Sequence, residues 1–173
     1  TSAIRSDVPR GQRRIKAETG WLSLDADHSV PVHVFRLAGI YGPGRNALNA
    51  IRAGRARRID KPSHTFSRIH VDDIALVLQA SMEKPNPGAI YNVCDDFPAA
   101  PAEVTAFGCD LLGVEPPPLV SFEEASKNMT TMGLSFWKDN RRVRNDRIKR
   151  ELGVSLVYPT YREGLRALAA DLR

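Results

Sequence analysis

Apolar residues along the chain form two kinds of pattern, short continuous runs and helical spacing. Residues 32–37 and 89–94 are apolar runs with the length of strands buried in a parallel sheet. Helical spacing precedes the first run over residues 13–25 and follows it over residues 46–53. The pattern therefore predicts the helix and strand units of an α/β sheet, with residues 32–37 as a central parallel strand.

Capping residues predict further helices along the chain. Asp72 or Asp73 can cap a helix over residues 71–82, and Pro101 suits the first turn of a helix that Gly113 closes. Capping-box spacing, in which glutamate follows serine or threonine by three residues, marks two more helix starts. These are Ser121 with Glu124, and Thr160 with Glu163.

Three stretches have shorter patterns. Residues 66–70 indicate a short strand, and we expect His70 at its end to be structural, bonded to the backbone. Asn145 can cap a helix that Gly153 ends. Residues 129–133 have no period, so we expect a mobile segment there.

The central run ends in a turn rich in glycine and proline, residues 39–45. Open α/β sheets bind ligands at this place, the carboxyl end of a strand. Gly42 and Gly44 allow the backbone to approach a ligand closely, and Arg45 supplies a guanidinium for phosphate or carboxylate. The same residues also fit a plain strand-to-helix loop with a solvated arginine.

Composition is that of a globular protein. The chain has 173 residues, of which 42% are apolar and 26% charged, enough for one domain with a sizeable core. It has neither a run of 18 apolar residues nor a basic leader before an apolar stretch, so we predict no membrane span and no secretory signal. Cys94 and Cys109 do not have the spacing of a disulfide framework or a zinc site. We therefore expect no metal and a reducing, cytoplasmic setting.

The net charge of +5 comes mainly from two basic clusters, residues 52–58 and 141–150. Nucleic acid is one possible partner for such clusters. However, Asp146 and Glu151 interrupt the second cluster, and few aromatic residues accompany either one. A solvated face or a pocket for an anionic small molecule is the favoured interpretation, and nucleic-acid binding is the weaker one.

Four segments, in order and spacing, resemble the NAD-dependent epimerase/dehydratase family, the extended and atypical short-chain dehydrogenases/reductases. They are RLAGIYGPGR at 36–45, RIHVDDIA at 68–75, AIYNV at 89–93 and YPTYREGL at 158–165. The resemblance covers nearly the whole chain. It implies part of a Rossmann-type doubly wound parallel sheet with a small carboxyl-terminal α/β lobe, NAD or NADP as cofactor and a small-molecule substrate. It also implies a homodimer through the helix at residues 13–25.

The resemblance further implies which part of the family fold is present. Family members begin with a strand, a GxxGxxG turn and a helix that hold the cofactor pyrophosphate, and this sequence has no such glycine cluster. We therefore expect the chain to be the carboxyl-terminal part of a longer protein. Residues 1–50 would be the second half of the Rossmann-like domain. Residues 51–173 would be mostly the substrate-side lobe, with 89–113 returning to the sheet.

The family's catalytic Tyr-x-x-x-Lys motif falls on Arg10 and Arg14. In the family, the lysine lowers the tyrosine pKa, and the tyrosine exchanges a proton while hydride moves to or from the nicotinamide. Arginine, with a pKa of about 12 or more, does not donate a proton near neutral pH. The resemblance thus implies an atypical member whose catalytic residues the sequence does not identify.

By resemblance, the glycine-rich turn lines the ligand cleft. Gly39, Ile40 and Tyr41 would contact the nicotinamide side of the cofactor, and Gly42 and Arg45 the substrate. A purely structural turn is the alternative.

Two further arginines are candidates for the anionic part of the substrate. Sugar-nucleotide epimerases often carry a diphosphate-binding arginine at the position of Phe66, and Arg68, two residues later, points to the same face of the strand. The alternative for Arg68 is a surface arginine paired with Asp72 or Asp73. Arg142 matches a second phosphate-binding arginine of some relatives, and surface charge is its alternative.

The sequence therefore predicts an atypical NAD(P)-binding short-chain dehydrogenase or epimerase-like protein, with a sugar-nucleotide-like substrate as one candidate. The alternative is a non-catalytic dinucleotide-binding module, a sensor or scaffold that lacks the proton relay. Arg10 and Arg14 favour the alternative.

Overall fold

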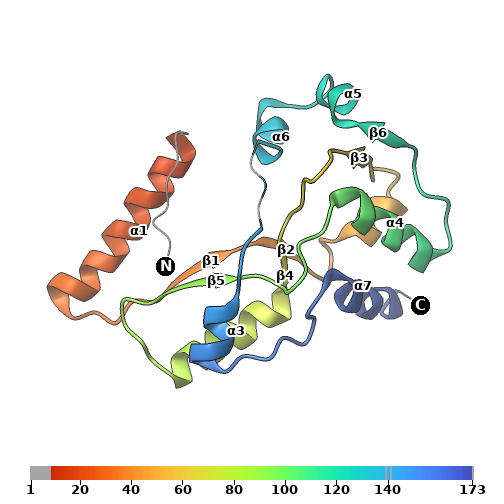
Figure 1. The fold of residues 1–173 in the computed structure, drawn as a ribbon. Helices are drawn as coiled ribbons and strands as arrows, with labels where there is room; N and C mark the ends of the chain where they lie inside the picture. Colours follow the sequence, from red (N-terminus) through yellow and green to blue (C-terminus); the bar gives the residue numbers. More distant parts are fainter. Residues whose placement is uncertain (1–8, 139, 141, 173) are drawn as a thin grey trace.

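Two pairs of parallel strands form the centre of the molecule (Figure 1). The structure is a computed structural model that describes residues 9–138, 140 and 142–172. One pair joins β1 (Val34–Leu37) to β5 (Ile90–Val93), and the other joins β2 (Gly39–Tyr41) to β4 (Arg68–His70). The predicted α/β fold with parallel strands is confirmed, and the two apolar runs pair directly with each other.

The stretch that begins with β1 changes its strand partner between Ala38 and Gly39. The amide of Ala38 donates to the end of β5 at 3.0 Å, whereas the amide of Gly39 donates to the carbonyl oxygen of Ser67 at 3.2 Å. β4 is also bonded on its other side, because the amide of Asp95 donates to the carbonyl oxygen of Arg68 at 2.6 Å. β4 therefore lies between β2 and the residues that follow β5.

Helices flank the strands. They are α1 (Pro9–His28), α2 (Ala47–Arg52), α3 (Val71–Glu83), α4 (Pro101–Leu112), α5 (Phe122–Ser126), α6 (Thr131–Phe136), the π-helical turn η1 (Ile148–Leu152) and α7 (Tyr161–Ala170). β3 (Arg58–Asp60) and β6 (Leu119–Ser121) form a third parallel pair beside α5. In Figure 1, α1 stands apart at one side of β1, and α5 and α6 lie beyond β2 and β4. We call α5 and α6, together with β3 and β6, the second lobe.

Two apolar cores hold these elements together. The first packs the sheet against α3 and η1 and consists of Ile69, Val77, Ala89, Tyr91, Val93, Ile148, Leu152 and Val154. The second joins β2 to α2, α4 and α7 and consists of Tyr41, Leu48, Ala99, Val104, Tyr161, Leu165 and Leu168. The strand that ends in Tyr41 thus connects the sheet to the helices α2, α4 and α7.

Most of the predicted helix ends are present. Gly113 has a φ of 64° after α4, a left-handed conformation that glycine adopts without strain. Thr160 and Glu163 form the predicted capping box of α7, and the Ser121 side chain accepts from the amide of Glu124 at the start of α5. Local side-chain chemistry therefore sets these boundaries.

The prediction that Asp72 or Asp73 caps α3 is wrong. The cap is His70, whose Nδ1 accepts from the amide of Asp72 at 3.2 Å. Asp73 is fully buried and accepts from the amides of Val157 and Tyr158, at 2.7 and 3.1 Å. Its carboxylate ties α3 to the segment before α7, a long-range role that local spacing does not reveal.

Residues 129–133, the stretch expected to be mobile, contain the start of α6, where the Thr130 side chain accepts from the amide of Gly133. One further expectation is corrected. Asn145 does not cap a helix with its side chain, which donates to the carbonyl oxygen of Cys94 at 2.8 Å and to Asp96 Oδ1 at 2.6 Å. Gly153, with a φ of 72°, ends η1 as predicted.

In the part of the chain that the structure describes, every helix is too short or too polar to cross a membrane.

Replacing Asp73 by alanine should destabilise the full-length protein by about 2–4 kcal/mol, because two buried amide donors lose a charged acceptor. Urea unfolding followed by circular dichroism measures this change. The matched control is Asp72→Ala, whose exposed side chain should contribute less than about 1 kcal/mol. Equal effects of the two substitutions would contradict the role assigned to Asp73.

Candidate functional site

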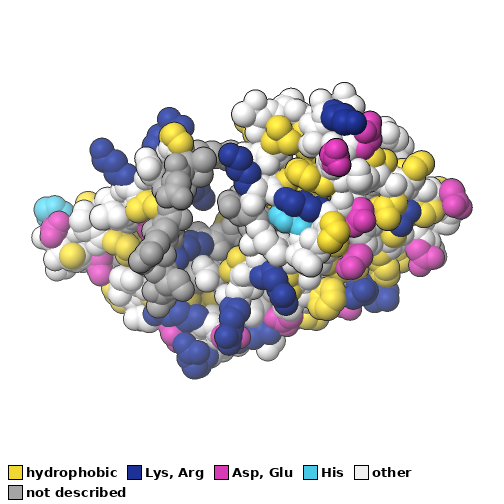
Figure 2. All heavy atoms as spheres, turned by 45° about the horizontal axis from the view of Figure 1, so that its top comes forward, with side chains coloured by type: hydrophobic (Ala, Val, Ile, Leu, Met, Phe, Trp, Pro, Cys, Tyr) yellow, Lys and Arg dark blue, Asp and Glu magenta, His cyan; other side chains and the backbone are white. Residues whose placement is uncertain are grey.

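A cleft of about 1040 Å³ opens where β1 and β2 change strand partner. Its walls come from residues 36–41, from β4 and the residues before it, from the first residue of α4, and from the end of α6. Figure 2 shows the molecule hollowed between the α1 side and the second lobe, with lysine and arginine side chains around the hollow. The cleft lies at the carboxyl ends of β1 and β5 and beside the first residues of β2 and β4. The carboxyl end of a strand is where open α/β sheets bind ligands.

The structure brings most of the predicted site residues together. Gly39, Ile40, Tyr41, Arg45 and Arg68 all line the cleft, although they come from two strands and a turn. The sequence spacing between the turn and β4 could not establish this proximity. The parallel pairing of β2 with β4 does, since it places Gly39 directly opposite Arg68.

Two predicted substrate contacts do not line the cleft. Gly42 is buried beside the start of α3, where a Cβ would lie 2.7 Å from Val71 Cγ1. Its lack of a side chain therefore allows the turn to pack on α3. Arg142 is exposed, while its neighbour Val143 lines the cleft.

The positions that match the family's catalytic pair lie on the first turns of α1. Arg14 is exposed and does not line the cleft. The side chain of Arg10 is outside the part of the chain that the structure describes.

The turn after β2 is held by a small hydrogen-bonded ring. The backbones of Gly42 and Arg45 exchange two hydrogen bonds, at 3.0 and 3.1 Å, and Gly44 between them has a φ of 74°. Asn46 closes the ring, since its side chain donates to the carbonyl oxygen of Gly42 at 2.8 Å and caps α2. The turn thus presents Arg45 to the cleft from a fixed backbone.

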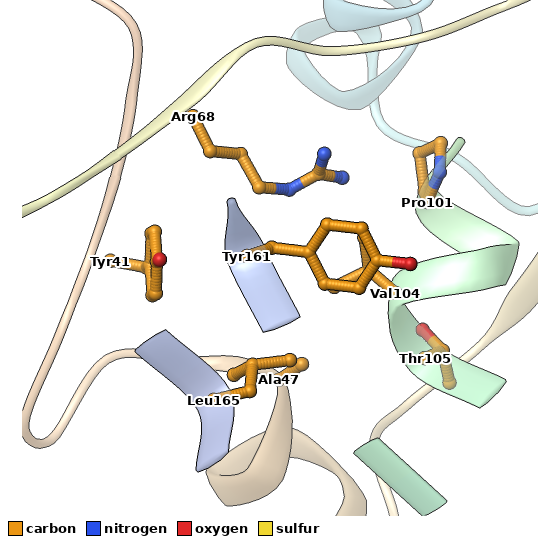
Figure 3. Close-up of a pocket in the computed structure, with 8 residues that line it drawn as sticks. All are labelled: Tyr41, Ala47, Arg68, Pro101, Val104, Thr105, Tyr161 and Leu165. Carbon is orange, nitrogen blue, oxygen red and sulfur yellow. The ribbon is translucent and has the colours of Figure 1, made fainter. Parts of the chain in front are cut away.

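Arg68 lies between the cleft and a smaller cavity of about 210 Å³ (Figure 3). Its Nη1 donates to the carbonyl oxygens of Phe66 and Ala99, at 2.9 and 3.0 Å. Burial lowers the pKa of Arg68, and the negative charge of Asp95 opposes that shift. Among the described residues Arg68 forms no ion pair with Asp72 or Asp73, the alternative considered from the sequence, and Asp95 is the carboxyl whose charge acts on it most strongly.

Asp95 is a buried carboxyl that sequence reasoning missed. Asp95 is 1% exposed, and neither of its carboxyl oxygens has a hydrogen-bond partner of regular geometry among the described residues. Burial raises the pKa of Asp95 to about 7, while the charge of Arg68 lowers it. An acidic residue directly after a strand predicted to be buried was the available signal.

Tyr41 is not suited to proton transfer at neutral pH. Its hydroxyl is buried without a hydrogen-bond partner in the described structure and lies against Gly164, where a Cβ would overlap it. Figure 3 shows Tyr41, Arg68 and Tyr161 around the smaller cavity. Burial raises the pKa of Tyr41 well above its usual value, so the hydroxyl stays protonated at neutral pH.

The far wall of the cleft is aromatic. Phe66, Phe136 and Trp137 line it, and Trp137 stacks on His64 with ring centroids 5.2 Å apart. The sequence pattern did not indicate this wall, because residues 129–133, just before Phe136 and Trp137, have no period and Phe66 is distant in the chain.

Comparison with known proteins gives the same fold. A conserved protein of unknown function from Silicibacter pomeroyi is 52% identical, with a TM-score of 0.89 over 99% of this chain and 58% of that one. The dTDP-glucose 4,6-dehydratase of Bacillus anthracis, solved in complex with NAD, is 18% identical with a TM-score of 0.74, over 97% of this chain and 53% of that one. The chain therefore has the fold of the carboxyl-terminal part of a Rossmann-like short-chain dehydrogenase.

Sequence comparison gives a relative but no family assignment. The Escherichia coli protein YeeZ is 29% identical over 160 residues, which are 90% of this chain and 50% of YeeZ. No protein-family model matches the chain. The chain spans about half the length of the curated relatives it matches.

Asp95→Asn should reduce the pH dependence of stability. The carboxyl binds its proton more tightly in the folded state, where its pKa is about 7, than in the unfolded state, where it is about 4. Its stabilising contribution is thus fully present below about pH 4 and is lost as the pH rises to about 7.

The free energy of unfolding of the full-length protein, measured by urea titration between pH 4 and 8, tests this. The variant should be more stable than the parent at pH 8, by on the order of a few kcal/mol, and its pH slope should be smaller. Asp96→Asn, at an exposed carboxyl paired with Lys149, should keep the parent's slope. If the Asp95→Asn variant kept the parent's dependence of unfolding free energy on pH, burial would not raise the pKa of Asp95, and the prediction would be wrong.

Proposed function

We propose that this chain forms the substrate-side part of a protein that binds a nicotinamide dinucleotide, NAD or NADP, as an atypical epimerase/dehydratase-type short-chain dehydrogenase. The observation that carries the proposal is the cleft at the strand-partner change between Ala38 and Gly39. Ligands of open α/β sheets bind outside the carboxyl ends of strands, and the cleft lies beside the carboxyl ends of β1 and β5. The likeness in fold to a dehydratase solved with NAD supports the same proposal.

One wall of the cleft fits the nicotinamide ring. Leu37 and Ile40 line it and are 41% and 39% exposed, although each is a large aliphatic side chain. The backbone of Gly39 lies between them, so a flat ring can approach closely. The proposed cofactor contacts are Gly39, Ile40 and Tyr41, and a bound cofactor would donate or accept hydride there.

The other proposed ligand is an anionic small molecule. Arg45 reaches the cleft from the rigid turn, and Arg68 lies at its floor, fixed by two carbonyl oxygens. Arg142 would join them only at the rim, and Gly42 would act by keeping the turn in place. A sugar-nucleotide-like substrate, implied by the family resemblance, is one anionic class that this arrangement admits.

The second candidate is a non-catalytic dinucleotide-binding module, a sensor or scaffold. Among the described residues that line the cleft, none has a side chain that exchanges a proton near neutral pH. Arg10 and Arg14 at the family's catalytic positions agree with this candidate. Consumption of NADH or NADPH by the full-length protein would decide for the enzyme, and saturable binding without consumption would decide for the module.

A homodimer through α1 is also part of the proposal. Trp21 on this helix is 62% exposed, and the contact of α1 with the sheet includes the ion pair of Glu18 with Arg36 at 2.6 Å. Analytical ultracentrifugation of the full-length protein and of Trp21→Glu tests this arrangement.

Full-length protein should bind NADH or NADPH saturably in titration calorimetry. Ile40→Asp should weaken that binding at least tenfold, because a carboxylate would stand where we place the ring face. The matched control is Val114→Asp, at an exposed apolar residue after α4 that does not line the cleft. Absence of binding to either nucleotide would overturn the proposal.

A further inference from the structure

We propose that the cleft selects a planar, apolar organic acid with a single negative charge, an aromatic monocarboxylate, over a nucleotide diphosphate sugar. This inference rests on the proposed function, since it specifies the substrate class of the same cleft. Three observations carry it: the aromatic wall, the engagement of two of the three lining arginines by other groups of the chain, and the scarcity of neutral polar groups in the described lining.

The aromatic wall is supported from behind. Trp137 contacts three rings: it stacks on His64 at an interplanar angle of 20°, meets Phe66 edge-on at 5.7 Å and lies 5.4 Å from Phe122. Lys61 holds the same residue by donating to the carbonyl oxygen of Trp137. A ring fixed in this way forms a pre-organised platform, so a flat ligand can stack on it with little loss of conformational entropy.

A second aromatic side chain extends the platform. Phe136 lines the cleft and is 43% exposed, although it lies at the end of α6 next to the buttressed Trp137. Large exposed aromatic residues grouped in a concave site indicate contact with an apolar ligand.

Two of the three arginines that line the cleft are engaged within the chain. Arg36 pairs with Glu18 at 2.6 Å, and Arg68 Nη1 donates to the carbonyl oxygens of Phe66 and Ala99, at 2.9 and 3.0 Å. Arg45 is exposed, and no described acidic side chain lies within ion-pair distance of it. Arg45 is therefore the exposed cation of the described lining, and a single exposed cation matches a carboxylate better than a diphosphate with two charges.

Neutral polar groups in the cleft are few. Ser67 and Asn92 are the described lining residues with a hydroxyl or amide side chain, apart from Tyr41, whose hydroxyl lies against Gly164. The Ser67 oxygen already accepts from the amide of Val143 at 2.9 Å. A sugar with several hydroxyl groups would lose hydrogen bonds to water that these walls do not replace.

The test compares four ligands by titration calorimetry on full-length protein, with and without saturating NADH or NADPH. They are 4-hydroxycinnamate; cinnamyl alcohol, which lacks the charge; cyclohexanepropionate, which lacks the planar ring; and UDP-glucose. We expect 4-hydroxycinnamate to bind at least tenfold more tightly than each of the other three. Tighter binding of UDP-glucose, or of the non-planar acid, would overturn the proposal.

Variants assign the selectivity to the named residues. Trp137→Leu and Arg45→Gln should each weaken 4-hydroxycinnamate binding about tenfold, the effect of losing a stacking or charged contact of roughly 1.4 kcal/mol. Phe97→Leu, a matched loss of an exposed aromatic side chain that does not line the cleft, should leave it unchanged. Equal binding by Trp137→Leu and the parent would contradict the platform, provided that circular dichroism shows both folded.

The two proposals fail in distinguishable ways. If the aromatic acid binds through Trp137 and Arg45 but neither nucleotide binds, the cofactor proposal fails and the assignment of the cleft stands. If a nucleotide binds and the aromatic acid does not, the inference about substrate class is wrong.

Discussion

The change of strand partner between Ala38 and Gly39 is the constraint on which the rest of the structure depends. Up to Ala38 the chain is bonded to β5, and from Gly39 it is bonded to β4, which is bonded to Asp95 on its other side. Insertion of β4 between two formerly adjacent strands opens the cleft and places Arg68 at its floor. The same step forces Asp95 into the interior, where burial raises its pKa. The candidate site and its most costly buried group therefore have one structural origin.

Charge and shape have separate sources in this cleft. The arginines come from the sheet side, where Arg36 pairs with Glu18 and Arg68 donates to two backbone carbonyl oxygens. The aromatic residues come from the second lobe, where Trp137 packs on His64 and Phe122. A ligand that bridges both sides would bury apolar surface on one and meet a single fixed cation on the other. The substrate class therefore depends on the packing of Trp137 in the second lobe as much as on the glycine-rich turn.

The sequence could predict the elements better than their long-range contacts. Apolar runs identified β1 and β5, and the spacing of Thr160 with Glu163 identified the start of α7, because these signals are local. Asp73 was misassigned as a helix cap because its partners, the amides of Val157 and Tyr158, are distant in sequence. Asp95 and the aromatic wall were missed for the same reason. The five predicted residues that line the cleft were identified from the glycine-rich turn and from family resemblance. The pairing of β2 with β4, which brings them together, was not predicted.

The most direct measurement is a crystal structure of the full-length protein with NADH or NADPH bound. The account predicts that the nicotinamide ring lies against the exposed wall of Leu37 and Ile40, with its reactive face toward the space between Arg45 and Trp137. A nicotinamide ring bound elsewhere, with this wall covered by protein, would contradict the assignment of the cleft as the site of a nicotinamide-binding protein.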